Sequence, residues 1–274
     1  MTQIDTSLIE MLVRKAVEEY VSGLATPAVP ADPMAALFQS PAVLDVRREI
    51  VRNAHKLWQR QYVDGNGGNL SSRISADYVI CTPTMFSKGD LTPDDLCLCD
   101  MEGNLLHGRH PRSSELLLHL AIYKANPAAR AVVHCHPPHA TAYALAGLMP
   151  PVGLIPEQEV LVGPAPLATY ATPGTQQFAD TVVPFVKSHT TVLLANHGVV
   201  CWADTVTHAE WRVEVIETYC QMLLLSRQLG PAVRLSSQDI DGLLDIKRRL
   251  GILDPRLQNA SVQSGEHASR SFLN

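Results

Sequence analysis

Two apolar runs that end in histidines place the strongest constraint on how this chain can fold. The run at 131–133 predicts a buried strand that leads directly into His134 and His136. Because side chains alternate faces along a strand, these two imidazoles point the same way, about 7 Å apart along it. A second run, at 191–195, predicts another strand and is followed by His197. Either run alone fits an ordinary strand end, but together they predict three imidazoles around one open position, which is typical of a catalytic metal.

A carboxylate lies at the predicted start of a helix over 116–125. The apolar residues of this segment recur at helical spacing, and Ser113 or Ser114 is a candidate N-cap. Glu115 would then lie in the first turn, where the helix dipole favours negative charge. That position explains Glu115 without catalysis, whereas a nearby metal would make it an acid/base group. The serine hydroxyls and free amides at such an end would also bind a phosphate or another anion.

Six short segments share their order and spacing with one known family, over more than half of the chain. They are Gly68-Asn69-Leu70-Ser71-Ser72-Arg73, Thr82-Pro83-Thr84, Arg112-Ser113-Ser114-Glu115, Val132-Val133-His134-Cys135-His136, Tyr170-Ala171-Thr172-Pro173-Gly174-Thr175 and Asn196-His197-Gly198. Together they resemble the class II aldolase/adducin family, and within it the L-fuculose-1-phosphate aldolase branch. Any one segment is weak, but the set is specific.

The resemblance implies a set of site residues and a zinc-dependent lyase. Zinc would be held by His134, His136 and His197, with Glu115 as the acid/base. Zinc is preferred here because three neutral imidazoles suit it. As a Lewis acid it would stabilise the enediolate charge that retro-aldol cleavage leaves behind. The residues implied to bind the substrate phosphate are Asn69, Thr84, Ser113 and Ser114, with backbone amides near Gly68 and Met85.

The implied reaction cleaves a phosphorylated deoxyketose, L-fuculose-1-phosphate or L-rhamnulose-1-phosphate, to dihydroxyacetone phosphate and lactaldehyde. Two departures from the family pattern bear on the substrate. Met85 replaces a glycine that is usual in its loop, and the position of a proton-donating tyrosine falls near Ile155. Glu157 or Glu159 is a candidate to line the pocket there. Lys88 is predicted to be a solvated loop charge, with a phosphate contact as the alternative.

Two other functions stay open at this point. A metal-dependent decarboxylase, a sugar-phosphate 4-epimerase or a dehydratase on the same scaffold would use the same metal-stabilised enolate, so the histidines do not separate them. A non-enzymatic scaffold like the adducin heads is the second alternative. The presence of all three histidines and of Glu115 counts against a scaffold.

The N-terminal segment, residues 1–23, predicts an amphipathic helical extension. Ser7 and Glu10 form a candidate capping box, and Gly23 is a stop. This helix resembles the encapsulation peptides that dock enzymes inside bacterial microcompartments. It would bind shell or cargo proteins through residues 7–23. The alternative is a structural extension packed on the catalytic domain. Residues 24–42 are rich in proline and alanine and predict a linker.

Residues 43–257 are predicted to form the catalytic domain, and 258–274 a loose tail. Helices are expected at 43–62, 116–125, 139–146, 175–187, 205–229 and 236–250, and strands within 65–81, 96–106, 131–136, 160–168 and 191–197. This mixture, with few regular crossovers, predicts an α/β (α+β) chain folded as a three-layer α/β/α sandwich with a largely antiparallel central sheet. The resemblance implies the same fold and a homotetramer with its active sites between subunits.

The bulk composition agrees with a cytoplasmic enzyme, here expected in a microcompartment lumen. Hydrophobic residues make up 46% of the chain, but no run is long enough to span a membrane. A net charge of −5 without a basic cluster argues against nucleic acid. The six cysteines lie in apolar contexts, which predicts buried, reduced thiols.

Overall fold

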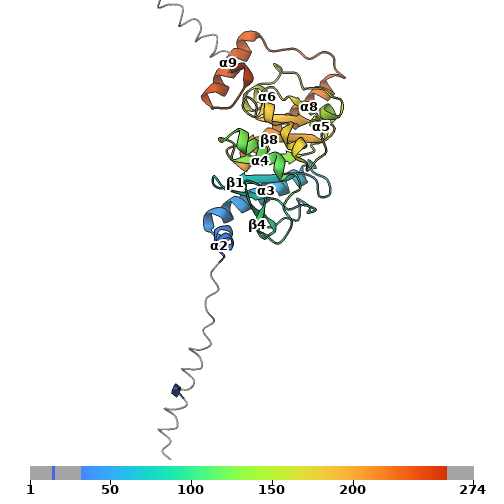
Figure 1. Cartoon of the computed structure of the whole chain (residues 1–274). Coiled ribbons are helices and arrows are strands. Elements are labelled where there is room, and N and C mark those ends of the chain that lie inside the picture. The colour runs from blue at the N-terminus through green and yellow to red at the C-terminus, as the bar shows by residue number, and fades with distance from the viewer. Residues whose placement is uncertain (1–13, 16–31, 258–274) are drawn as a thin grey trace, which may run out of the picture.

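An eight-stranded sheet forms the centre of the protein in a computed structural model that describes residues 14–15 and 32–257 (Figure 1). The strand order is β4-β3-β2-β1-β5-β8-β7-β6. All neighbours are antiparallel except β6 and β7, which are parallel. The strands are β1 (Asn69–Arg73), β2 (Tyr78–Cys81), β3 (Cys97–Asp100), β4 (Leu105–His107), β5 (Ala131–Cys135), β6 (Leu167–Ala168), β7 (Thr191–Leu194) and β8 (Gly198–Ala203).

Helices cover both faces of this sheet and make the molecule a three-layer α/β/α sandwich. One layer holds α3 (Pro41–Gln59), α5 (Pro138–Leu145) and α8 (Val206–Ser226). The opposite layer holds α4 (Leu116–Ala125) and α7 (Gln176–Asp180). The remaining elements are α2 (Pro33–Gln39), α6 (Pro156–Leu161), α9 (Ser237–Arg249) and the 3₁₀ turns η1 (Pro93–Asp95) and η2 (Val183–Phe185). The predicted fold class is confirmed.

The two faces of β5 show how the core determines the position of the histidines. Val133 and Cys135 belong to the hydrophobic cluster beneath α3, α5 and α8. Val132 belongs to the cluster beneath α4 and α7. Since side chains alternate along a strand, His134 shares the face of Val132 and points toward the α4 layer. All five residues of β5 are buried.

Two predicted elements differ from the structure because of proline and local packing. The helix expected over 175–187 is divided into α7 and η2, since Pro184 cannot continue the hydrogen bonding of an α-helix. The strands expected over 160–168 are reduced to β6, because residues 156–161 form α6. Among the described residues, no helix is long and apolar enough to cross a membrane. All six cysteines are buried and free.

The second half of the predicted linker is helical, so the predicted boundary at residue 43 is wrong. Asp32 caps α2 by accepting a hydrogen bond from the Met34 amide, and Pro33 occupies the first turn, where it suits a helix. Phe38 is 2% exposed, and the Arg47 guanidinium stacks over its ring at 3.9 Å. The folded domain therefore includes α2. The extension predicted over 1–23 and the tail predicted over 258–274 lie outside the described residues, apart from 14–15.

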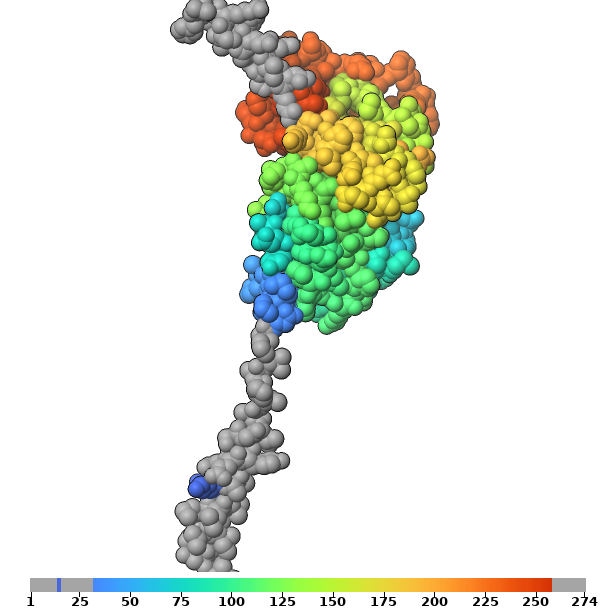
Figure 2. Space-filling model, viewed as in Figure 1, coloured from blue at the N-terminus to red at the C-terminus, as the bar shows by residue number. Residues whose placement is uncertain are grey.

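A buried ion network holds α9 and the segment that follows it against α6. Figure 2 shows α9 at the end of the domain opposite α2. Lys247 Nζ donates to Asp254 Oδ2 at 2.8 Å and to the Glu159 and Val162 carbonyls at 3.1 and 3.0 Å. Arg256 pairs with both Asp254 and Glu159, at 2.7 Å each. Glu159, predicted as a pocket residue, is instead fully buried in this network.

Opposite charges in the network keep Asp254 ionised. Burial acts to raise the pKa of Asp254, but hydrogen bonds from Arg256 and Lys247 outweigh it and lower the pKa below 3.8. A carboxyl whose pKa is depressed on folding stabilises the fold above its unfolded pKa. That stabilisation is lost as pH falls through the folded pKa.

We expect Lys247→Met to lower the free energy of unfolding by about 3 kcal/mol, because it removes one of the two cations that pair with buried Asp254 and leaves two carbonyls without their Lys247 donor. Urea denaturation followed by circular dichroism measures this loss. The matched control is Arg248→Ala on the same helix, which removes only an exposed pair with Asp245. It should change stability by less than about 0.5 kcal/mol. Equal losses in the two variants would contradict the structural role of the network.

Candidate metal centre

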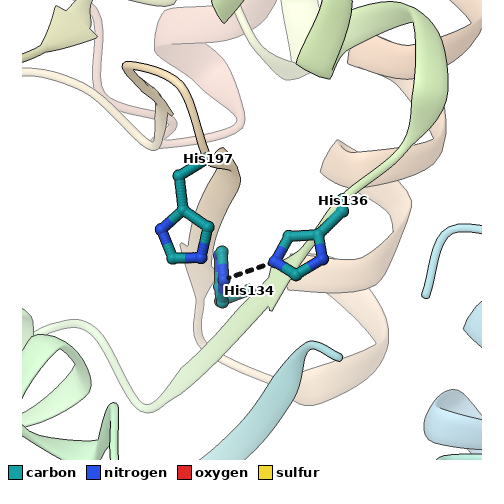
Figure 3. Close-up of side chains that lie close together, drawn as sticks. All are labelled: His134, His136 and His197. Carbon is teal, nitrogen blue, oxygen red and sulfur yellow. Dashed lines mark hydrogen bonds between the residues drawn. The ribbon is translucent and has the colours of Figure 1, made fainter. Parts of the chain in front are cut away.

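Three histidine side chains converge on one point near the centre of the sheet. His134 lies on β5, His136 follows it directly, and His197 lies in the turn between β7 and β8. Figure 3 shows the three rings turned toward one another. One ring nitrogen from each lies within 4.8 Å of the others. The structure therefore brings together the three residues predicted as metal ligands.

Tight backbone geometry brings His197 to the end of β5. Asn196 adopts a positive φ of 55°, a conformation that asparagine tolerates better than most residues. A Cβ atom on Gly198 would lie 2.5 Å from the Cys135 carbonyl oxygen, so only glycine allows β8 to begin this close to β5. The residues on both sides of His197 therefore have a structural role: Asn196 allows the turn, and Gly198 allows the close approach of β8 to β5.

Hydrogen bonds fix which nitrogens face the centre. His134 Nδ1 lies 2.9 Å from the Val199 carbonyl, which can only accept, so Nδ1 carries the proton. His136 Nδ1 lies 3.4 Å from the Asp64 carboxylate, which also accepts, so Nδ1 of this ring carries the proton as well. Their Nε2 atoms then present lone pairs to each other at 3.2 Å. Tetrahedral zinc with ordinary bond lengths holds two nitrogens about 3.3 Å apart. The cluster therefore fits a divalent cation of this kind.

The protonation states also suit a metal. Burial, followed by the neighbouring imidazoles, lowers the pKa of His134 well below its usual value. Burial and His136 lower the pKa of His197 to about 4. Both rings are thus neutral near pH 7, which is the state that binds metals.

The Glu115 carboxylate lies beside this cluster. Oε2 is 3.3 Å from His134 Nε2, and Oε1 is 3.4 Å from His197 Nε2. Asn69 Nδ2 donates to Oε2 at 2.7 Å. Burial raises the pKa of Glu115, while the Asn69 hydrogen bond and the electrostatic influence of His136 and Lys88 partly offset the effect. A buried carboxylate against ligand nitrogens is well placed to exchange a proton with a bound substrate.

The helix-end explanation of Glu115 is wrong in its details. Glu115 itself, not Ser113 or Ser114, occupies the N-cap position of α4, and its side chain makes no capping hydrogen bond. Ser113 Oγ instead accepts from the Glu115 amide at 3.3 Å. The carboxylate is thus turned away from the helix end and toward the histidines.

The loops predicted to bind phosphate pair with each other next to Glu115. Pro83 and Arg112 form a β-bridge, the Ser113 amide donates to Thr82 O, and the Thr84 amide donates to Pro111 O. Ser113 is buried, Thr84 is half-buried and Ser114 is exposed. This pairing brings the threonine and serine segments into one region.

Two backbone positions determine how closely these loops approach the site. Gly68 has a φ of +69°, and a Cβ there would lie 2.9 Å from the His134 carbonyl. Met85, in place of the family's usual glycine, has a φ of +53°, and its side chain is 79% exposed. The loop therefore keeps a glycine-like backbone despite Met85, at a cost of about 1 kcal/mol.

Lys88 is buried, so the prediction of a solvated loop charge is wrong. It is 1% exposed, and its Nζ donates to the Asn66 and Phe86 carbonyls at 2.9 and 2.8 Å. Burial lowers its pKa to about 8, and the nearby Glu115 charge opposes that shift. Lys88 thus ties the loop before Gly68 to the loop that contains Met85, and it adds a buried positive charge.

Three buried side chains near the site were not predicted from the sequence. His119, Ser71 and Tyr123 are buried in a hydrogen-bonded row behind Asn69. Their spacing was a usable signal, because His119 and Tyr123 follow Glu115 at intervals of four along α4. At the position where family aldolases have a tyrosine, Ile155 is the N-cap of α6, and Glu157 is exposed on that helix.

Comparison with known proteins identifies a family and several similar relatives. The sequence profile of the Class II Aldolase and Adducin N-terminal domain matches residues 48–224. The chain is 33% identical over 182 residues to an L-fuculose phosphate aldolase of Methanococcus maripaludis, covering 66% of this chain and 97% of the relative. It is 36% identical over 172 residues to a 3-oxo-tetronate 4-phosphate decarboxylase of Haemophilus influenzae, covering 61% and 81%.

Solved structures show the same fold. The YgbL protein of Escherichia coli is 31% identical, with a TM-score of 0.68, over 73% of this chain and 98% of that one. An L-fuculose 1-phosphate aldolase is 26% identical, with a TM-score of 0.69, over 76% and 97%. This chain thus spans nearly the whole of both structures.

We expect the purified chain to hold about one divalent ion, and His134→Gln to lose most of it, because His134 supplies one of the three candidate ligand nitrogens found among the described residues. Inductively coupled plasma mass spectrometry of dialysed protein measures the metal content. His139→Gln is the matched control, since His139 hydrogen bonds Glu217 at 2.6 Å instead of joining the cluster. Retention of metal by the His134 variant, or equal loss in the control, would contradict the assignment.

Proposed function

Because this chain belongs to the class II aldolase and adducin family, we propose that it is a metal-dependent lyase that cleaves a phosphorylated deoxyketose. The proposed substrates are L-fuculose-1-phosphate and L-rhamnulose-1-phosphate, and the products are dihydroxyacetone phosphate and lactaldehyde. The observation that carries the proposal is the Glu115 carboxylate, held 3.3–3.4 Å from two of three converging histidines.

The proposed roles follow from the donor set. His134, His136 and His197 would hold the metal, for which zinc is our candidate because the ligands are neutral imidazoles. When bound, the metal supplies a Lewis acid for the negative charge that develops on the substrate oxygens. Glu115 would take the proton from the substrate hydroxyl and return it to the reacting carbon. Its raised pKa suits both directions of that transfer.

The proposed phosphate site is the region where the two paired loops meet. Thr84, Ser113 and Ser114 would donate hydroxyl hydrogen bonds, and the amides near Gly68 and Met85 would add backbone donors. The positive φ values of Gly68 and Met85 support this role, because such turns expose successive amides on one side. Asn69 uses one amide hydrogen on Glu115 and keeps the second for substrate.

A decarboxylase is the second candidate, and two observations favour it. A 3-oxo-tetronate 4-phosphate decarboxylase is among the similar relatives. In addition, no tyrosine occupies the position near Ile155 where family aldolases place a proton donor. Loss of carbon dioxide from a carboxylate requires no proton transfer on the departing group. Release of an aldehyde requires that the hydroxyl proton of the departing half be removed. Both reactions leave the electron pair on the same phosphorylated three-carbon half, so one set of ligands serves either.

The deciding experiment offers the metal-loaded protein three substrates: L-fuculose-1-phosphate, L-rhamnulose-1-phosphate and 3-oxo-tetronate 4-phosphate. Dihydroxyacetone phosphate forms in every case, so the second product must be identified. Lactaldehyde from either sugar supports the aldolase and ranks the two sugars. Carbon dioxide from the oxo acid, without sugar cleavage, would replace the aldolase proposal with the decarboxylase.

We expect Glu115→Gln to lower kcat by about 10²–10⁴-fold on the active substrate, because the amide cannot transfer the proton. The metal content should stay near that of the wild type, since the three histidines remain. Glu157→Gln is the control, because Glu157 is an exposed carboxylate on α6. A Glu115 variant with wild-type kcat would remove Glu115 from the proposed chemistry.

We further propose that the enzyme is a homotetramer and that residues 7–23 direct it into a bacterial microcompartment. The tetramer would place active sites between subunits, and its mass is measurable by light scattering. Lactaldehyde is a reactive product, which gives confinement a chemical reason. The helical pattern of residues 7–23 supports the targeting role.

Deletion of residues 1–31 tests the targeting proposal, because it spares α2 and its buried Phe38. We expect unchanged kcat and thermal midpoint, together with loss of co-purification with shells in cells that make a microcompartment. Deletion of 1–41 is the contrasting variant and should lower the thermal midpoint, since it removes Phe38 from the core. Shell association by the 1–31 deletion would contradict a targeting role for this segment.

A further inference from the structure

A row of buried polar side chains extends from Glu115 into the core between β1 and α4. Asn69 Nδ2 lies 2.7 Å from Glu115 Oε2, and Asn69 Oδ1 lies 2.6 Å from His119 Nε2. On the other side of the imidazole, His119 Nδ1 lies 2.6 Å from Ser71 Oγ, which lies 2.7 Å from the Tyr123 hydroxyl. The four side chains behind Glu115 are at most 5% exposed.

Two regular elements build this row. Asn69 and Ser71 are two positions apart on β1, so they share one face of the sheet. Glu115, His119 and Tyr123 are four positions apart and share one side of α4. The surrounding residues of this layer are apolar. Burying polar groups in such a layer is unfavourable unless each is hydrogen-bonded, as all of these are.

The hydrogen bonds of the row can run in only one direction when Glu115 is ionised. The carboxylate only accepts, so the Asn69 amide must present Nδ2 to it and Oδ1 to His119. His119 therefore carries its proton on Nε2, and its bare Nδ1 accepts from the Ser71 hydroxyl. Ser71 in turn accepts from Tyr123. The opposite amide orientation would aim Asn69 Oδ1 at a carboxylate oxygen 2.7 Å away.

Burial keeps the intermediate members in the protonation states that this direction requires. It lowers the pKa of His119 to about 3, so the ring is neutral and retains an acceptor nitrogen. It also raises the pKa of Tyr123, which therefore remains a hydroxyl donor. The orientation of the Asn69 amide is then determined by His119 on one side and by Glu115 on the other.

We propose that His119 is a positioning residue: acting through Asn69, it holds the Glu115 carboxylate in the orientation that faces the three histidines. This inference rests on the proposed role of Glu115 as the acid/base. It is independent of whether the substrate is a sugar phosphate or an oxo acid. The hydrogen bonds of His119 reach neither the histidine cluster nor Thr84, Ser113 or Ser114, so its link to the site runs through Asn69.

The kinetic test compares His119→Leu with His119→Gln in the full-length, metal-loaded protein. Leucine removes the donor to Asn69, so kcat should fall about 10- to 100-fold, with a smaller change in KM. Glutamine offers an amide N–H near the position of Nε2 and should recover most of kcat. His189→Leu is the matched control: in the described part of the chain the His189 ring hydrogen bonds Ser188 and Phe185, away from the site, so kcat should stay unchanged.

A double variant separates positioning from loss of packing. Once Asn69→Ala has broken the link, adding His119→Leu should lower kcat no further, since non-additivity reports a shared route. Additive losses would overturn the proposal and assign His119 a structural role. Wild-type kcat in His119→Leu, or a glutamine variant no better than leucine, would overturn it as well.

A spectroscopic test does not depend on knowing the substrate. Nitrogen NMR of histidine-labelled protein, assigned by difference against His119→Gln, should show a neutral ring protonated on Nε2 down to mildly acidic pH. A ring protonated on Nδ1 would reverse the row and overturn the proposal. If the wild type cleaves none of the three substrates, the proposed function fails in the assay, while this measurement still decides the inference.

Discussion

The pairing of β5 with β1 on one side and β8 on the other positions most groups of the site. His134 lies opposite Asn69 on β1 and opposite Val200 on β8. A slip of one residue in either ladder would turn His134 into the opposite core layer. The apolar neighbours prevent that slip, because Val132 and Val133 fill different hydrophobic clusters. The ligand geometry therefore follows from the ordinary register of a buried sheet.

Helix α4 carries the other residues of the site. Its burial on most sides explains why its sequence is apolar nearly all round. Most of its residues are buried, so it lacks the single apolar side that was predicted. Apart from the exposed Lys124, the polar residues of α4 are the row of Glu115, His119 and Tyr123, which faces Asn69 and Ser71 on β1. A helix enclosed on nearly all sides can hold a carboxylate with little rotational freedom. That rigidity is what preorganised catalytic groups require.

Strand alternation predicted His134 and His136 on one face, and the second apolar run predicted His197. Both expectations needed only local periodicity, and the structure brings the three rings together, while their role as metal ligands stays a prediction. The predictions for Lys88 and Glu159 were wrong because the burial of these residues depends on distant parts of the chain. The burial of Lys88 depends on the Asn66 carbonyl, 22 positions away, and that of Glu159 on Arg256, 97 positions away. A charged residue in a loop carries no local sign of such a distant partner, so its burial follows only from the assembled fold.

Hydrogen-bond acceptors of Glu115 and the histidines lie close together in the site, and this links its activity to the stability of the fold. Burial raises the pKa of Glu115 and lowers the pKa values of His134 and His197. The fold also holds Glu115 Oε2 3.3 Å from the unprotonated Nε2 of His134. These atoms repel unless a cation or proton lies among them. A divalent ion that binds only the folded chain would relieve the repulsion and stabilise the fold by mass action. The same exclusion of water strengthens every charge–dipole contact at the centre. Burial therefore makes the site unfavourable to form without a cation, and the same burial would strengthen its electrostatic interactions once the metal is bound.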